Sequence, residues 1–395
     1  LKMKPLIIAL FITFKSKPLS LQLSMQIIRF LLMSSLLGAS PAIYAKRLPL
    51  EKLNLPDGFV IEKYADVPNA RQMNHGGDGV VYVGTRKDGD VYAVVDDDGD
   101  GKSDTVHLID DNLNMPSGLA YKDGDLYVGA VSEILVYRNI DSQLQNPPKP
   151  EVLTDQLPDK RHHGWKYLGF GPDGKLYIPV GAPCNICLSD NPQFASILRM
   201  DVSHPEQLEG FASGIRNTVG FDWHPTTGEL WFTDNGRDMM GDDLPPGELN
   251  KISKRGQHFG YPFFHAGSIP DPKFGKGKQS DDYVYPALKL DPHVAALGIK
   301  FYLGNMFPKQ YHEQVFMAEH GSWNRSKKAG HTGHRITVAR KDSKGDLVYE
   351  TLVDGWLQNN KAWGRPVDVL ELSDGSMLIS DDKAGVIYRL SYVSP

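Results

Sequence analysis

The chain has 395 residues, of which 41% are hydrophobic and 23% are charged. These are ordinary values for a soluble globular protein, and they exclude wholesale disorder and a polytopic membrane protein. Lys and Arg total 43 against 48 Asp and Glu, so the formal net charge is -5, and nucleic acid is not expected as a partner.

The first expected element is an export signal. Met25 opens the stretch MQIIRFLLMSSLLGASPAIYA, in which Arg29 gives a positive start, an apolar core follows, and Ala45 ends a run of small residues. We therefore expect a signal peptide in residues 1–45, with the part before Met25 as an upstream extension, and a periplasmic mature domain in residues 46–395. An uncleaved anchor is the alternative, although the apolar run is shorter than the about 20 residues of a membrane span.

The mature part repeats one unit, a Gly-containing turn followed by a strand of β-branched and aromatic residues and often by a second strand. Such a turn between apolar runs is the usual hairpin signal. The six instances begin at or near Asp78, Asp123, Asp173, Gly228, Gln314 and Asp374. They predict an all-β fold, a six-bladed β-propeller with four-stranded antiparallel blades. Loops from every blade would meet at one end of its axis, so a site there would draw residues from distant parts of the sequence.

An acidic loop between two expected strands has the pattern of a calcium site. Asp96, Asp98 and Asp100 stand at alternate positions of DDDGDGKSD, as in the front of the EF-hand loop. Position twelve of that loop is His107 rather than Glu, so a shorter loop closed by Asp104 is the better hypothesis. We expect a structural Ca2+ here, with a solvated acidic turn as the alternative.

Cys184 and Cys187 are the only two cysteines of the sequence. No His follows the second one, which excludes the c-type haem attachment motif, and no second pair completes a zinc site. In an exported protein this spacing favours a local disulfide. Free thiols and a metal site are the alternatives.

Six separated stretches resemble a known family when taken together. They are HHGWKYLGFGPDGKLYIPVG, FASGIRNTVGFDWHP, TDNGRDMMGDDLPPGELN, DPHVAALGIKFY, HGSWNR and WGRPVDVL. Their order and spacing, from about Leu55 to Leu390, resemble the pyrroloquinoline quinone (PQQ)-dependent soluble sugar dehydrogenases, and among these the L-sorbosone dehydrogenase-like branch. The resemblance implies a six-bladed propeller that uses PQQ and Ca2+ to oxidise an aldose-type sugar or sugar aldehyde. A quinone or a cytochrome would then accept the electrons.

The resemblance also implies a catalytic base. Oxidation of a sugar hydroxyl requires a group that removes its proton, and a His side chain has a pKa suited to that task. The matching residue is His163. It is preceded by His162, where the soluble glucose enzymes have an acid.

Cationic residues would hold the three carboxylates of PQQ, because Arg binds a carboxylate through two parallel hydrogen bonds. By resemblance these cofactor-binding residues are Arg216 and Asn217 in SGIRN, and Arg365 in WGRPVDV. A second family Arg is replaced by Val367, and Arg325 in HGSWNR is the expected substitute.

A second Ca2+ would activate PQQ. The resemblance assigns it to the backbone carbonyls of Gly236 and Arg237 in DNGRD, and assigns a structural calcium to Glu248 in PGELN. Backbone ligation does not depend on the side chain, so Arg237 can replace the Pro of the glucose enzymes.

Two other classes of function remain open. One is a calcium-dependent propeller lactonase or other hydrolase, although no G-x-S-x-G or H-E-x-x-H motif occurs. The other is a non-catalytic propeller that binds a protein or a glycan. Trp165, Trp231 and Trp323 could line a sugar site, but packing between blades is the more ordinary use of such residues.

Overall fold

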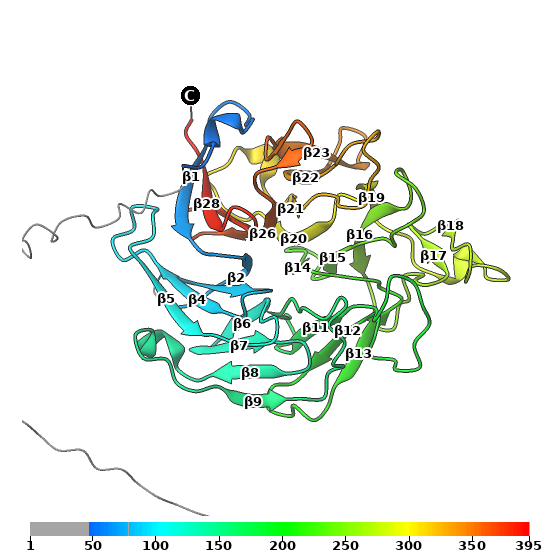
Figure 1. Cartoon of the computed structure of the whole chain (residues 1–395), viewed down its shortest axis with the longest axis horizontal. Coiled ribbons are helices and arrows are strands. Elements are labelled where there is room, and N and C mark those ends of the chain that lie inside the picture. Colours follow the sequence, from blue (N-terminus) through cyan, green and yellow to red (C-terminus); the bar gives the residue numbers. More distant parts are fainter. Residues whose placement is uncertain (1–46, 78, 395) are drawn as a thin grey trace, which may run out of the picture. The chain divides into compact units, whose positions relative to one another are not determined.

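The computed structural model describes residues 47–77 and 79–394 (Figure 1). The chain divides into two units, Leu1–Leu48 and Pro49–Pro395. The expected signal peptide lies outside the described residues and stays a prediction. Within the described ranges no helix is long and apolar enough to cross a membrane.

The second unit consists of six four-stranded antiparallel sheets, the blades, arranged in a ring (Figure 1). Each blade is defined by its strands. From the inner edge outward they are β2 (Ala70–His75), β3 (Val80–Thr85), β4 (Val91–Val95) and β5 (Thr105–Asp110) in blade 1; β6 (Gly118–Lys122), β7 (Asp125–Gly129), β8 (Ile134–Tyr137) and β9 (Glu151–Thr154) in blade 2; β10 (Gly169–Phe170), β11 (Leu176–Val180), β12 (Ser196–Met200) and β13 (Glu209–Ser213) in blade 3; β14 (Phe221–Trp223), β15 (Leu230–Asp234), β16 (Pro246–Ile252) and β19 (Leu288–Pro292) in blade 4; β20 (Ala296–Phe301), β21 (Val315–Glu319), β22 (Arg335–Lys341) and β23 (Leu347–Val353) in blade 5; and β26 (Pro366–Glu371), β27 (Met377–Asp381), β28 (Val386–Tyr392) and β1 (Phe59–Asp66) in blade 6.

The remaining regular elements are short. They are the hairpins β17 (Phe264–His265)–β18 (Ile269–Pro270) and β24 (Leu357–Gln358)–β25 (Lys361–Ala362), and the 3-10 helices η1 (Leu50–Lys52), η2 (Ile140–Gln143), η3 (Ser280–Asp282) and η4 (Lys309–Tyr311). The fold prediction, an all-β six-bladed propeller, is confirmed.

The ring is closed by pairing the two ends of the propeller sequence. β1 is the outer strand of blade 6, where it runs antiparallel to β28 from the pair Phe59↔Tyr392 to the pair Asp66↔Val386. Figure 1 shows β1 and β28 side by side, in blue and red. Blade 6 therefore cannot be completed without both ends of the domain.

The turn-strand repeats of the sequence fall on the second strand of every blade, from β3 in blade 1 to β27 in blade 6. These strands are rich in Val, Ile, Leu and aromatic residues, and they are almost wholly buried. Such residues pack well on a pleated surface that is covered on both faces. The covering comes from the adjacent blades. One core cluster joins Tyr82 of β3 to Leu126 of β7, and similar clusters join other neighbouring blades.

One polar side chain links three blades at the axis. The Gln72 amide on β2 donates to the carbonyls of Leu119 (2.9 Å) and Leu168 (2.7 Å) and accepts from the backbone N–H of both residues (2.9 Å each). Leu119 belongs to β6 and Leu168 directly precedes β10. The inner edges of blades 2 and 3 are thus satisfied by a side chain of blade 1, and all of these groups are buried.

Candidate functional site

A cavity of about 280 Å³ lies at one end of the propeller axis. Most of the residues around it lie just before or at the start of the innermost strand of a blade, or follow the second strand. These two kinds of position meet at the same end of every blade. Its lining includes Arg71, Arg86, His163, Trp165, Arg216, Asn217, Asn235, Gly236, Asp238, His320, Gly321, Trp323 and Arg365. Five of the predicted site residues are therefore brought together, namely His163, Arg216, Asn217, Gly236 and Arg365.

The cavity is strongly cationic. Arg71, Arg86, Arg216 and Arg365 line it, and Asp238 is the one acidic side chain among its described lining residues. Four guanidinium groups around one small cavity repel one another unless a counter-charge is present. The cavity is therefore suited to a ligand with several negative charges.

Arg216 has most of its donors engaged by the protein. Its Nε donates to the Asn185 carbonyl (2.9 Å), one Nη to the Asn235 carbonyl (3.0 Å), and the other Nη to Asn185 Oδ1 (2.9 Å) and Asp238 Oδ2 (3.2 Å). A guanidinium has five N–H groups. Within the described residues one N–H of Arg216 is left for a ligand, so this side chain cannot give the two parallel bonds that the sequence prediction assumed.

The three other arginines have more donors to offer. Arg365 donates to the carbonyls of His320 (3.0 Å) and Gly321 (2.6 Å), which leaves three N–H groups without a partner in the described part of the chain. Arg71 is paired with Asp382 at 2.8 Å, and its buried Nε has no hydrogen-bond partner in the part of the chain that the structure describes. The carboxylate of Asp382 also contacts His320 Nε2 at 2.8 Å, which fixes that imidazole next to the cavity.

Arg86 makes the least protein contact. Its guanidinium carbon lies 3.6 Å from the ring centroid of Trp165, a cation–π stack, and its buried Nε has no hydrogen-bond partner among the described residues. Burial, with the positive charge of Arg71, lowers the pKa of Arg86 to about 10, so the group remains protonated at neutral pH. A half-buried cation with no ion-pair partner among the described residues is costly, and an anionic ligand would offset that cost.

His163 is held with one ring nitrogen toward the protein. Its Nδ1 lies 2.9 Å from the Ala182 carbonyl, which requires a proton on Nδ1 and leaves the lone pair on Nε2. The residue has a left-handed backbone (φ 52°) and packs against Gly181, where an added Cβ would lie 2.5 Å from the His163 Cβ. Burial, and then the charge of Arg216, lower the pKa of His163 well below its ordinary value of 6.5. The imidazole is therefore neutral, as a proton acceptor must be.

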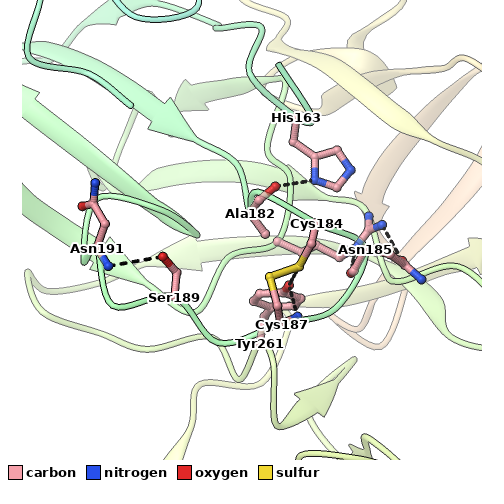
Figure 2. Close-up of a disulfide and its surroundings, with 9 residues drawn as sticks. His163, Ala182, Cys184, Asn185, Cys187, Ser189, Asn191 and Tyr261 are labelled. Atoms are coloured by element: carbon pink, nitrogen blue, oxygen red, sulfur yellow. Dashed lines mark hydrogen bonds between the residues drawn. A yellow bond between two sulfur atoms is a disulfide. The ribbon is translucent and has the colours of Figure 1, made fainter. Parts of the chain in front are cut away.

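The predicted disulfide is confirmed between Cys184 and Cys187 (Figure 2). The small loop that it closes follows β11 and contacts the side of the cavity through Asn185. The Tyr261 hydroxyl anchors the loop, because it accepts from the Cys187 N–H (3.1 Å) and contacts the Cys184 sulfur (3.7 Å).

The backbone of Arg216 and Asn217 is fixed by a buried carboxylate. The two oxygens of Asp234 accept the Arg216 N–H (2.9 Å) and the Asn217 N–H (2.7 Å). Asp234 pairs across the sheet with Glu248, and burial together with Asp234 raises the pKa of Glu248 to about 8. Two adjacent buried carboxylates favour either a shared proton or a bound cation.

Besides the acidic loop, three predicted residues lie outside the described lining of the cavity, namely Arg325, Arg237 and Glu248. Arg325 donates to the carbonyls of Gly330 (2.8 Å) and Asp242 (2.6 Å), so it holds a surface loop. The Arg237 side chain pairs with the buried Asp271 at 2.6 Å, although its neighbour Gly236 does line the cavity. Val367, the position at which the resemblance implies an arginine, is buried and packs with other apolar side chains.

The predicted calcium loop is remote from the cavity. The carboxylate oxygens of Asp96, Asp98 and Asp104 lie within 4.8 Å of one another, whereas Asp100 does not join this group. The loop connects β4 to β5, and its Ser103 N–H donates to the carbonyl of Tyr64 on β1 at 3.0 Å. It therefore bridges blades 1 and 6, as expected for a structural site. That it binds calcium stays a prediction.

Sequence reasoning missed Arg71, Arg86 and the His320–Asp382 pair. A positional signal could have found three of these residues. Arg86, His320 and Asp382 directly follow the second strand of their blades, as Asn235 does in blade 4.

The three tryptophans that could line a sugar site lie in different surroundings. Trp231 is buried between blades, Trp165 lies beneath Arg86, and Trp323 is exposed at the cavity.

The fold and this cavity define a class, the six-bladed propellers with an axial site. Among solved structures, the chain is similar to the holo form of the pyranose dehydrogenase PQQ domain from Coprinopsis cinerea, with a TM-score of 0.71 and 18% identity over 86% of this chain and 97% of that one. It is also similar to a calcium structure of a Trichoderma reesei member of carbohydrate-active enzyme family AA12, with a TM-score of 0.73 and 18% identity over 86% and 97%. At this identity the likeness establishes the fold.

The chain belongs to the family of the domain of unknown function DUF7133, whose model matches residues 46–391. A relative from Borreliella burgdorferi, described as an uncharacterized protein, is 33% identical over 356 residues, which cover 86% of this chain and 91% of that one.

Proposed function

We propose that this protein is a PQQ-dependent dehydrogenase that oxidises an aldose-type sugar or sugar aldehyde. The observation that carries the proposal is the cavity with four arginines, each of which keeps at least one N–H group without a partner in the described residues. A planar tricarboxylate fits this donor set, because charge-assisted bonds to carboxylates are the strongest that Arg makes. The fold shared with PQQ-holding propellers supports the same ligand.

The cavity assigns the contacts with PQQ to partly different residues from those that the motifs indicate. Arg86, Arg71 and Arg365 would meet its carboxylates, whereas Arg216 would give a single N–H and keep its place through Asn185 and Asp238. Asn217 would contact the cofactor from the adjacent wall. A role of Arg325 in cofactor binding stays a prediction, because Arg325 is not among the described lining residues of the cavity.

When bound, PQQ would supply the hydride acceptor, so the redox chemistry would be that of the cofactor. The protein would supply the base. His163 Nε2 carries the lone pair and would accept the proton of the substrate hydroxyl, while the Ala182 carbonyl holds the Nδ1 proton and so stabilises the imidazolium that forms. His162 is exposed next to it, with the two ring centroids 4.1 Å apart.

Calcium would bind at three places. The carbonyls of Gly236 and Arg237 lie beside an acidic cluster that includes Asp238 and the buried Asp234, which favours a cation next to the cavity. Glu248, buried against Asp234, is the proposed carboxylate of a structural ion. The loop of Asp96, Asp98 and Asp104 would hold an ion that is independent of the cofactor.

We further propose that the mature domain acts in the periplasm and passes electrons to a quinone or a cytochrome. The disulfide between Cys184 and Cys187 supports an oxidising compartment, because such bonds rarely persist in a bacterial cytosol. The export signal expected before residue 46 is consistent with it.

The test is reconstitution of the purified protein with PQQ and Ca2+, followed by dye reduction with a panel of aldoses and sugar aldehydes. We expect sugar-dependent reduction that requires both additions and is lost with a calcium chelator. Lactone hydrolysis that needs calcium and not PQQ would instead identify the protein as a hydrolase. Sugar binding without any turnover would identify a binding module.

A further inference from the structure

The disulfide loop Cys184–Cys187 contacts the cavity through one side chain. Asn185 presents its backbone carbonyl to Arg216 Nε and its side-chain Oδ1 to an Arg216 Nη, both at 2.9 Å. The same Oδ1 accepts the Asp238 N–H (2.8 Å), and the Asn185 amide donates to the Asp238 carbonyl (3.1 Å). One residue therefore holds both the cation and the acid that is paired with it.

His163 is held by Ala182, which precedes the disulfide loop and does not belong to it. The Ala182 N–H donates to the Arg216 carbonyl (2.8 Å), and the Ala182 carbonyl accepts from His163 Nδ1 (Figure 2). Asn185 makes no contact of this kind with His163. A change at Asn185 should therefore move Arg216 and leave the base in place.

Arg216 needs such support because it is only 4% exposed and has few alternatives to these partners. Two of its four hydrogen bonds come from Asn185, and the others come from Asn235 and Asp238. Without Asn185 the guanidinium could turn fully toward Asp238, which lies 3.2 Å away. Its remaining free N–H would then no longer point where a ligand meets it.

A tetrapeptide loop on a propeller surface has little to fix its backbone, but this loop is closed by a covalent bond. The Tyr261 hydroxyl, from the insertion after β16, anchors both ends of the bridge. Closing a short loop removes backbone freedom that would otherwise have to be lost on each binding event.

We propose that Asn185 is a positioning residue for Arg216, and that the Cys184–Cys187 disulfide holds Asn185 in that role. The anion affinity of the cavity then depends on the redox state of two cysteines that do not touch the ligand. That the anion is PQQ rests on the proposed function. That Asn185 positions Arg216 does not depend on it.

The first measurement needs no ligand. Hydrogen exchange of the Arg216 Nε–H is followed by NMR in protein labelled with 15N-arginine, with the signal assigned from Arg216→Lys. We expect at least tenfold faster exchange in Asn185→Ala and in the double variant Cys184→Ser/Cys187→Ser. Asn191→Ala, an exposed asparagine outside the bridge, should exchange like wild type. Unchanged exchange in Asn185→Ala would overturn the proposal.

The second measurement uses PQQ as the probe, with calcium present. Asn185→Ala should weaken PQQ binding about tenfold, while turnover at saturating PQQ stays near wild type because Ala182 still holds His163. Equal loss of turnover and affinity would contradict a positioning role confined to Arg216. If wild type binds no PQQ, the proposed function fails, and the exchange experiment still decides whether Asn185 positions Arg216.

Discussion

Arg86 differs from the other cavity arginines because its guanidinium stacks on an aromatic ring, whereas theirs donate to carbonyl or carboxylate oxygens. It stacks on Trp165 at 3.6 Å, while Arg71 is neutralised by Asp382 and Arg216 by Asp238. A ligand carboxylate would therefore find its least compensated cation at Arg86. This residue, which no motif indicated, should contribute more to anion binding than Arg216.

We predict that Arg86→Ala weakens PQQ binding at least tenfold, because a charge-assisted hydrogen bond contributes about 1.5–3 kcal/mol and a tenfold change corresponds to about 1.4 kcal/mol. Isothermal titration with calcium present measures the effect. The neighbouring Lys87→Ala removes the same charge from an exposed position and should change little. Equal affinity of Arg86→Ala and Lys87→Ala would count against Arg86 as a ligand.

His163→Ala should lose about 10²–10⁴-fold in the rate of PQQ reduction by sugar, the usual contribution of a positioned general base. PQQ should still bind, since His163 makes none of the cationic contacts. Stopped-flow absorbance of the reconstituted variants measures the rate, with His162→Ala as the control from the next position. A wild-type rate in His163→Ala would remove His163 as the base.

The pH profile tests the same residue. Burial and the charge of Arg216 lower the pKa of His163, so the neutral, active form persists below pH 6.5. Activity should fall only as pH drops through this lowered pKa. We therefore expect the acidic limb of kcat/KM below pH 6.5, with enzyme stability checked at each pH. An acidic limb at or above 6.5 would contradict the buried, neutral imidazole.

At the scale of elements, the acidic residues of the β4–β5 turn differ in whether their carboxylates join the oxygen cluster. The carboxylates of Asp98 and Asp104 belong to the oxygen cluster, while Asp97, between Asp96 and Asp98, does not. Asp98→Asn/Asp104→Asn should abolish most of the rise in melting temperature that calcium causes, since a ligand that binds only the folded state stabilises it. Asp97→Asn should keep that rise. A calcium-dependent shift that survives in the double variant would rule out this site.

The Gln72 side chain stabilises the inner edges of blades 2 and 3 through its hydrogen bonds to Leu119 and Leu168. Gln72→Leu removes four hydrogen bonds from the buried backbone groups of Leu119 and Leu168, of which only the Leu119 carbonyl keeps another contact, to Asn74 Nδ2 at 3.4 Å. Each such loss costs roughly 1–3 kcal/mol, so we expect destabilisation of at least about 3 kcal/mol in guanidinium unfolding. Gln145→Leu, at an exposed position, should stay within about 0.5 kcal/mol of wild type.

At the scale of the molecule, a chain with a net charge of -5 gathers four arginines at one end of its axis. This separation of charge is made by topology. Arg71 and Arg365 are nearly three hundred residues apart in the sequence, and they meet because β1 closes the ring on β28. A cationic cavity within an acidic protein focuses the local field and draws anions toward the axis.

The sequence predicted the propeller because each second strand has a local signature of turn and β-branched residues. Strands such as β10, with two residues, have no such signature and emerge only from pairing with β11. The same limit applies to the site. His163, Arg216 and Arg365 lie in motifs, whereas the stack of Arg86 on Trp165 and the support of Arg216 by Asn185 depend on contacts between distant segments. Local patterns cannot encode such contacts.

The most direct test of the central claim is equilibrium titration of the purified wild-type protein with PQQ in the presence of calcium. We predict saturation at one PQQ per chain, with micromolar or tighter affinity, and clear weakening when calcium is removed. No saturable binding, or binding that Arg86→Ala and Arg365→Ala leave unchanged, would contradict the assignment of the axial cavity as a PQQ site.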